Sequence, residues 1–348
     1  MHPLRNLALA GALCPWLLAP SACSNGSPTP TPAKPPPLVG GLDFSAGELT
    51  AGGGYLFWSQ LDSNGDTYSI QRVAQTGGTP EALVDGIGAP GGLTSDGTTL
   101  YWTDFYAGNL LAAPVASAPG AAPAVLATGL TSPRDVVVAG PVVFVVEELG
   151  LGSNRLVSVA LAGGATTTVS SESAGWLSGL AGDGTAAYFV LVDDPGSCLG
   201  TSPCASRLMR YSAGDAAPRQ LVAFPKELVA LPQQAVFDVA VGGGTVYLDP
   251  EGVADGQVNG QAIAKVAPRG TSATAVAPVV GLVTGLAATA SGAVYWGDES
   301  GLWTVPAGGA PATQLSTAND VYDLASDGES MFALEGTLEG ASIVAVNP

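Results

Sequence analysis

Short apolar runs, each with the length of a β-strand, alternate with glycine-containing turns along most of the chain. One aromatic residue recurs inside such a run in seven successive repeats, usually just after a turn. The spacings between these aromatic residues are 44, 43, 44, 59, 48 and 37 residues. The aligned residues are Phe57, Tyr101, Phe144, Tyr188, Tyr247, Tyr295 and Phe332. Self-similarity at about 40–45 residues predicts a repeat architecture.

The second repeat illustrates the pattern within one unit. Residues 92–95 form a short strand, and Asp96-Gly97 supplies a tight hairpin because both residues tolerate positive φ. Residues 99–104 form the aromatic strand, and residues 109–115 and 122–127 form two more. Four strands in each repeat predict an all-β, seven-bladed β-propeller of four-stranded antiparallel blades.

The two ends of the repeat region complement each other. The last repeat ends after its third strand, at residues 343–346. Residues 37–42 carry a Leu-Val pair followed by Gly and another apolar residue, as residues 82–87 do in the fourth strand of the first blade. We therefore expect residues 37–42 to form the outer strand of the last blade, which closes the ring and removes an open edge.

Residues 101–104 are Tyr-Trp-Thr-Asp, and residues 295–298 are Tyr-Trp-Gly-Asp. These runs resemble the YWTD repeats of low-density lipoprotein receptor ectodomains, and bacterial exported TolB-like propellers are also similar. The resemblance extends over about residues 38–348 at the level of the repeat pattern. It implies a propeller with a binding role and no particular reaction. YWTD propellers have six blades, so six is the alternative to the count of seven.

The N-terminal segment carries the features of an export signal. Arg5 precedes an apolar stretch over residues 7–18, which is shorter than a membrane span. The following Pro-Ser-Ala-Cys resembles a lipobox ending at Cys23; cleavage near Ala22 without a lipid is the alternative. The expected organisation is a signal peptide (1–22), a lipidated Cys23 with a Pro-rich linker (23–36) and the propeller (37–348). This organisation places the domain in the cell envelope, on the outer membrane.

The remaining cysteines and the charge restrict the partners. Cys198 and Cys204 lie in a Gly/Ser/Pro-rich insertion, where an exported protein is expected to form a disulfide; two free thiols are the alternative. The net charge of −18 disfavours nucleic acid and anionic membranes and favours cations or basic partners. Charged residues are only 11% of the chain, beside 48 glycines, which agrees with short strands and many turns.

Propellers commonly bind ligands on the face where the fourth strand of one blade leads into the first strand of the next. At the start of these inner strands the repeats alternate between an acid and a glycine, with carboxylates at Glu48, Asp135, Asp238 and Asp323. Arg134, Tyr322 and Trp176 lie close by in the sequence. Converging carboxylates form a receptor for a basic group or a Ca²⁺ or Mg²⁺ site. The structural alternative is that these acids accept N–H groups from the neighbouring blade.

Two further sets of residues are candidates. Asp62, Asn64 and Asp66 surround a glycine turn and resemble half of a calcium loop; a polar hairpin without metal is the favoured interpretation. A second set of acids ends the aromatic strands, and we expect structural roles for Asp104 and Asp298. The members of this set are Asp104, Glu147, Asp193, Asp249, Asp298 and Glu335. The tryptophans Trp58, Trp102 and Trp296 are expected to pack between blades.

Catalysis is disfavoured by the residue types available. The sole histidine, His2, lies in the expected signal peptide, which excludes a Ser-His-Asp mechanism or a His-ligated zinc site in the mature protein. The leading hypothesis is a monomeric binding or scaffolding lipoprotein that presents its channel face to a protein, peptide, glycan or cation. The alternative is a metal-dependent hydrolase or lactonase that uses the four carboxylates, and a purely structural envelope role is the third.

Overall fold

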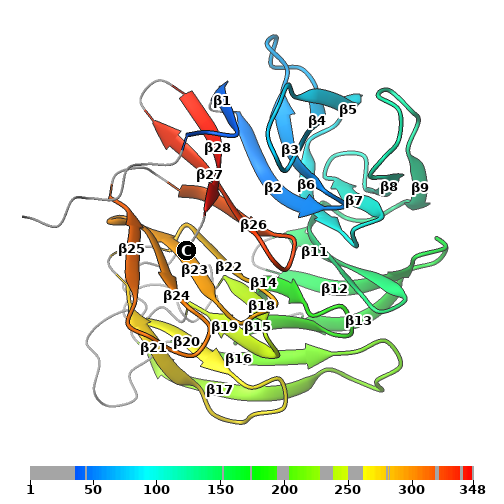
Figure 1. The fold of residues 1–348 in the computed structure, drawn as a ribbon. Coiled ribbons are helices and arrows are strands. Elements are labelled where there is room, and N and C mark those ends of the chain that lie inside the picture. The colour runs from blue at the N-terminus through cyan, green and yellow to red at the C-terminus, as the bar shows by residue number, and fades with distance from the viewer. Residues whose placement is uncertain are drawn as a thin grey trace, which may run out of the picture. The chain divides into compact units, whose positions relative to one another are not determined.

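The computed structural model forms seven four-stranded antiparallel sheets, arranged as blades around a central axis (Figure 1). It describes residues 36–43, 45–150, 153–172, 175–193, 204–227, 238–249, 262–279, 281, 283–317, 321–337 and 340–346. No helix in these ranges is long and apolar enough to cross a membrane. The seven-bladed all-β fold predicted from the repeats is confirmed, and the six-bladed alternative is not.

Each of the first four blades uses four consecutive strands, ordered from the channel outwards. Blade 1 contains β2 (Ala46–Gly52), β3 (Tyr55–Leu61), β4 (Tyr68–Ala74) and β5 (Glu81–Ile87). Blade 2 contains β6 (Pro90–Ser95), β7 (Thr99–Asp104), β8 (Asn109–Pro114) and β9 (Ala124–Ala127). Blade 3 contains β10 (Pro133–Ala139), β11 (Val142–Gly150), β12 (Ser153–Ala160) and β13 (Thr167–Glu172). Blade 4 contains β14 (Gly175–Gly182), β15 (Ala187–Asp193), β16 (Cys204–Tyr211) and β17 (Arg219–Glu227).

The last three blades follow the same plan, except that the final blade takes its outer strand from the other end of the chain. Blade 5 contains β18 (Val239–Gly242), β19 (Thr245–Leu248), β20 (Ala262–Val266) and β21 (Thr274–Pro278). Blade 6 contains β22 (Gly285–Ala288), β23 (Val294–Asp298), β24 (Gly301–Val305) and β25 (Thr313–Ser316). Blade 7 contains β26 (Val321–Ser326), β27 (Met331–Thr337), β28 (Gly340–Val346) and β1 (Val39–Leu42).

The pairing of β1 with β28 closes the ring. Val39 lies opposite Ile343 and Leu42 opposite Ala341, with a register irregularity between the two pairs. The Leu38 N–H also donates to the Ile343 carbonyl at 2.8 Å. The predicted exchange of an N-terminal strand into the last blade is therefore confirmed.

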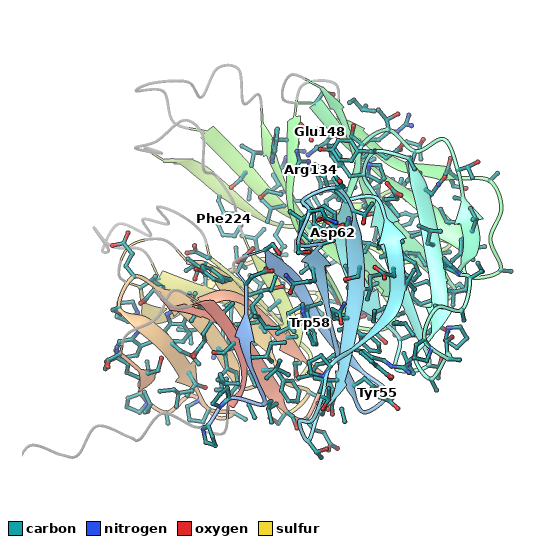
Figure 2. All side chains as sticks on the ribbon, turned by 90° about the horizontal axis from the view of Figure 1, so that it is seen from above. Tyr55, Trp58, Asp62, Arg134, Glu148 and Phe224 are labelled. Atoms are coloured by element: carbon teal, nitrogen blue, oxygen red, sulfur yellow. The ribbon has the colours of Figure 1, made fainter. Side chains whose placement is uncertain are left out.

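The hydrophobic core is divided among the contacts between blades. Seven buried clusters occur in the described residues, and each combines side chains from two neighbouring blades. Trp58 lies between blades 7 and 1, Trp102 between blades 1 and 2, and Trp296 between blades 5 and 6, all fully buried (Figure 2 labels Trp58). The expected packing role of the three tryptophans is confirmed. Burying one such ring contributes about 4–6 kcal/mol by area, before entropy costs.

An aspartate-glycine turn joins the inner strand to the aromatic strand and explains part of the repeat pattern. The Asp96 carboxylate accepts the backbone N–H groups of Thr98 and Thr99, both at 2.8 Å, and the Tyr101 hydroxyl at 2.9 Å. Gly97 has a φ of 86°, which a residue with a Cβ rarely adopts. The turn therefore fixes the aromatic side chain as well as the chain reversal.

Ring closure makes a direct prediction for Val39, whose side chain is 5% exposed between blades 7 and 1. Val39→Asp should lower the free energy of unfolding by about 3 kcal/mol, because a charge would enter an apolar cluster. Urea unfolding followed by circular dichroism measures the change. Val125→Asp is the matched control, because Val125 is 55% exposed on the outer strand β9. Equal losses in the two variants would contradict a closing role for β1.

Candidate functional site

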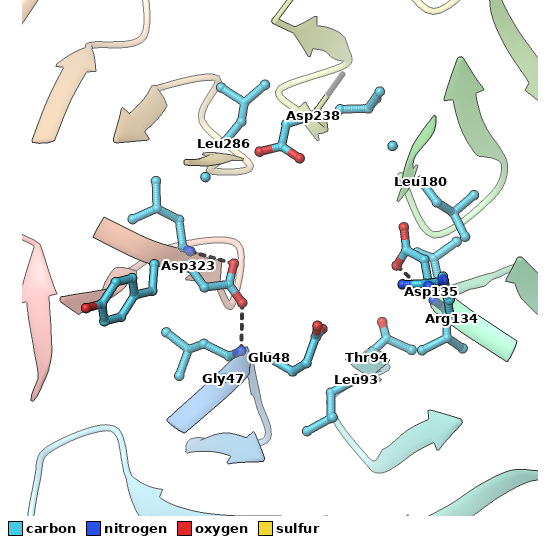
Figure 3. Close-up of a pocket in the computed structure, with 18 of the residues that line it drawn as sticks. Gly47, Glu48, Leu93, Thr94, Arg134, Asp135, Leu180, Asp238, Leu286 and Asp323 are labelled. Atoms are coloured by element: carbon cyan, nitrogen blue, oxygen red, sulfur yellow. Dashed lines mark hydrogen bonds between the residues drawn. The ribbon is translucent and has the colours of Figure 1, made fainter. Parts of the chain in front are cut away.

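A cavity of about 730 Å³ opens at the channel, with walls built by the inner strands of all seven blades. Four carboxylates face it, one from each of blades 1, 3, 5 and 7, as Figure 3 shows. These are the predicted residues Glu48, Asp135, Asp238 and Asp323. The structure thus brings the sequence-predicted acids of the odd-numbered blades to one site.

Leucines fill the places between the acids. Leu93, Leu180 and Leu286, from blades 2, 4 and 6, line the same cavity and are half-buried (Figure 3). In odd blades an acid faces the cavity and the next, aliphatic residue is buried, as in Glu48-Leu49. In even blades a glycine replaces the acid and the next leucine is partly exposed. We call these seven side chains the acid–leucine ring: Glu48, Leu93, Asp135, Leu180, Asp238, Leu286 and Asp323.

Irregular pairing directs several of these side chains into the channel. The register between the first two strands of a blade shifts between Gly47 and Thr50, between Pro133 and Val136, and between Val321 and Asp323. β-Bulges of this kind re-aim a side chain and are frequent beside binding sites. Glu48, Asp135 and Asp323 therefore lie at bulges near the start of their inner strands, whereas Asp238 directly precedes β18, whose pairing with β19 is regular.

Glu48 adopts a backbone conformation that favours glycine. Its φ is 46°, and Gly179, at the equivalent bulge of blade 4, has a φ of 55°. A non-glycine residue in this region costs of order 1 kcal/mol, and such residues cluster at functional sites. The surrounding ring holds a carboxylate at a position where the backbone alone would favour glycine.

Two of the acids also connect neighbouring blades. Asp323 accepts the Leu49 N–H of blade 1 and the N–H of Leu324 in its own strand, both at 2.7 Å (Figure 3). Asp135 accepts the Val136 N–H at 2.8 Å and a further backbone hydrogen bond from Leu180 of blade 4. The structural alternative is thus correct for these two acids, which face the cavity as well.

The protein environment raises the pKa of all four carboxyl groups. Desolvation by the channel wall, followed by repulsion from Asp323 and Asp135, raises the pKa of Glu48 to about 8. Desolvation, then repulsion from Asp323, raises the pKa of Asp238 to about 7. Glu48 remains exposed to the cavity and Asp238 is half-buried, so both still reach solvent.

Desolvation is also the largest cause of the raised pKa at the other two acids, although backbone N–H groups stabilise their charged forms. It raises the pKa of Asp135 to about 7, with added repulsion from Asp238 and Asp323, and the pKa of Asp323 to about 6. Near neutral pH the ring therefore holds fewer than four negative charges. A cation that entered the cavity would favour ionisation and displace protons.

Comparison with known proteins places this fold among solved propeller-containing structures. No protein-family model matches the chain, and no curated protein matches it by sequence. Puromycin hydrolase is similar with a TM-score of 0.65 and 16% identity, over 87% of this chain and 52% of that one. A prolyl endopeptidase is similar with a TM-score of 0.55 and 12% identity, over 86% of this chain and 49% of the endopeptidase chain.

A gluconolactonase from Xanthomonas campestris is similar with a TM-score of 0.50 and 13% identity, over 89% of each chain. These likenesses show the fold alone. The chain spans about half the length of the puromycin hydrolase and of the prolyl endopeptidase.

The other residues predicted for the channel face lie at its rim or outside it. The Arg134 guanidinium pairs with Glu148 and lies over the Phe105 ring at 5.2 Å (Figure 2). Tyr322 is exposed and packs against Gly336, where an added Cβ would lie 2.2 Å from its hydroxyl. Trp176 is partly buried against the cluster between blades 4 and 5 and does not line the cavity.

The acids that end the aromatic strands have structural partners. Glu147 accepts the Thr131 N–H at 2.7 Å and pairs with Arg155 at 2.6 Å, while almost completely buried. Asp298 accepts the Ser300 N–H at 2.8 Å, and Asp104 accepts the Ala107 N–H at 2.9 Å. The expected structural role of Asp104 and Asp298 is confirmed. Asp249 and Glu335 are also buried, and the side chain of Asp193 lies outside the described set.

The proposed half of a calcium loop is a hydrogen-bonded hairpin turn. Asp62 accepts the Asp66 N–H at 2.9 Å and the Thr67 hydroxyl at 3.2 Å, and the first of these is the main cause of its lowered pKa. Asn64 and Asp66 are exposed. Across the ranges that the structure describes, no three His, Cys, Asp or Glu side chains gather closely enough to hold one metal ion.

The cysteine predictions fall largely on residues outside the described part of the chain. Cys23 and Cys198 lie there, and Cys204 is described only as a backbone position in β16. Lipidation and the disulfide therefore stay predictions. The leucines of the ring were missed, although each directly follows the glycine of its repeat, so the pattern Gly-Leu in place of acid-Leu was available in the sequence.

The raised pKa of Asp238 predicts a pH-dependent stabilisation by Asp238→Asn. Its pKa rises from 3.8 to about 7, so between these values the folded protein binds more protons than the unfolded chain and loses stability as pH rises. The variant should raise Tm by about 2 °C or more at pH 8 and have little effect at pH 4. Thermal scans at both pH values measure this.

Asp85→Asn is the control for this experiment, because it makes the same change of charge at an exposed position on β5. It should leave Tm within about 1 °C at either pH. A lower Tm for Asp238→Asn at pH 8, or the same shift at both pH values, would show that the Asp238 carboxylate is not destabilised by its surroundings.

Proposed function

We propose that the chain is a cell-envelope binding propeller that holds a basic side chain of a protein or peptide partner in its channel mouth. The acid–leucine ring is the single observation that carries this proposal. Carboxylates supply negative charge, and the leucines between them supply an apolar wall. Lysine and arginine match both features, because an aliphatic stem carries the charged head.

Electrostatics supports a cationic partner. The ring is partly desolvated, so a positive charge interacts with its carboxylates more strongly than in bulk water. The net charge of −18 also attracts basic partners over longer distances at low ionic strength. Binding would be coupled to proton release, since the cation stabilises the ionised acids.

The other candidate functions have less support. A divalent metal takes several oxygen ligands at short distance, and the described acids do not form such a group. A hydrolase or lactonase would need a catalytic set beyond the ring carboxylates, and the likeness to a gluconolactonase concerns the fold. Binding a basic side chain requires no catalytic group and no close set of metal ligands, only the negative charge and the partly buried cavity of the acid–leucine ring.

The location of the protein completes the proposal. A lipid on Cys23 and a Pro-rich linker over residues 23–36 would tether a monomeric propeller to the outer membrane, with Cys198 and Cys204 joined in a disulfide. The resemblance to YWTD repeats agrees with a binding role in this place. A partner in the envelope would then meet the channel face without diffusing far.

Nα-acetyl-lysine amide tests the receptor function, with Nα-acetyl-norleucine amide as the uncharged analogue. Calorimetry at pH 8 and low salt should show that the lysine probe binds at least about tenfold more tightly. Asp135→Asn with Asp238→Asn should weaken that binding at least about tenfold, and lowering the pH to 5 should weaken it as the acids become protonated.

Asp85→Asn with Glu329→Gln is the control pair, because it removes two exposed acids outside the cavity. This pair should bind the lysine probe as the wild type does. Equal affinity for the two probes would refute the proposal. Stabilisation by CaCl₂ that is lost in the double ring variant would assign the acids to a metal instead.

Metabolic labelling with an alkyne fatty acid in a bacterial host tests the anchor. The wild-type chain should take up the label and partition into detergent, and Cys23→Ser should abolish both. Cys14→Ser, inside the expected signal peptide, should keep the label. Labelling that survives in Cys23→Ser would rule out the predicted lipid site.

A further inference from the structure

Exposed hydrophobic side chains gather on the face that carries the cavity. Tyr106 is 81% exposed in the turn after β7, and Leu149 and Tyr322 are also exposed. Pro90 pairs with Asp104, and Pro133 with Glu147, so the ends of β7 and β11 lie beside the starts of the inner strands. Tyr106 and Leu149 are therefore on the same face as the acid–leucine ring.

The patch over blades 2 and 3 is continuous with the cavity. Arg134 lines the cavity, its guanidinium lies 5.2 Å from the Phe105 ring, and Phe105 packs edge-on against Tyr106 at 5.2 Å. Glu148 pairs with Arg134. We call Phe105, Tyr106 and Arg134 the rim shelf.

The rim shelf has the composition of a protein-binding surface. Tyrosine and arginine are enriched in the residues that dominate binding energy, and an exposed cluster of large apolar side chains marks an interaction site. Glu148 and Phe105 hold Arg134 in place, so less conformational entropy is lost on binding. A free cation or a lone amine would leave this surface uncovered.

We infer that the partner is a polypeptide that places a basic side chain in the acid–leucine ring and a large apolar side chain on the rim shelf. This inference rests on the proposed function of the ring. Arg134 directly precedes Asp135 of the ring in the sequence, and its guanidinium lies at most about 10 Å from the Tyr106 ring. An extended chain advances about 3.3 Å per residue, so we place the apolar residue a few positions from the basic one and vary the spacing in the test.

Short peptides test the inference. Each peptide begins with a lysine that is acetylated at its α-amino group and keeps its charged side-chain amine. Alanine spacers follow, and a tryptophan stands two, three or four residues after the lysine. The reference peptides carry alanine in place of tryptophan. Calorimetry should show that at least one tryptophan peptide binds about tenfold more tightly than its reference. Tyr106→Ala should remove that gain and leave the affinity for Nα-acetyl-lysine amide unchanged.

Val125→Ala is the control, because Val125 is exposed on the outer strand β9 and away from the channel. It should keep the full gain from tryptophan. If the lysine amide binds but no tryptophan peptide binds more tightly, the rim shelf is refuted and the ring proposal stands. If Tyr106→Ala keeps the gain, the shelf is likewise refuted. If neither the lysine amide nor any peptide binds, both proposals fall.

Discussion

The structure depends on the burial of apolar side chains between blades. A four-stranded blade has two apolar faces and cannot cover either one alone, so each blade is stable only against two neighbours. All seven clusters of the described core lie at such contacts, and the cluster between blades 7 and 1 includes Val39 of β1. Closure by β1 is thus part of the core, and the channel exists because the ring is complete.

An odd number of blades has an electrostatic consequence at the closing contact. Acids alternate with leucines around the channel, but alternation cannot continue across the join, so Asp323 and Glu48 become neighbours. After desolvation, repulsion from Asp323 contributes most to the raised pKa of Glu48. Asp323 also accepts the Leu49 N–H across the same contact. The positive φ of Glu48 adds backbone strain there. Repulsion, strain and a stabilising hydrogen bond therefore coincide at the contact between blades 7 and 1.

The repeat spacing predicted the positions of the strands and of the residues at their starts. It did not predict the directions of side chains, which depend on packing. Strand starts lie at fixed places in each repeat, so Glu48, Asp135, Asp238 and Asp323 were found, as was the pairing of the segment around Val39 with the last blade. The direction of a side chain depends on bulges and neighbours that the repeat does not encode. Trp176 therefore packs between blades 4 and 5 instead of lining the cavity. Arg134 forms an ion pair with Glu148, which the fold brings close to it.

The raised pKa values explain how such a ring can persist without a ligand. Four ionised acids in a partly desolvated channel would repel one another, but protons neutralise some of them near pH 7 and reduce that repulsion. In the proposed function, a lysine or arginine head would replace these protons with its own charge, and its stem would contact leucines of the ring. A small hydrated cation would gain the charge interaction but leave the leucines uncovered. The combination of acids with leucines therefore favours an amphipathic cation over a bare one, because only the former gains from both halves of the ring.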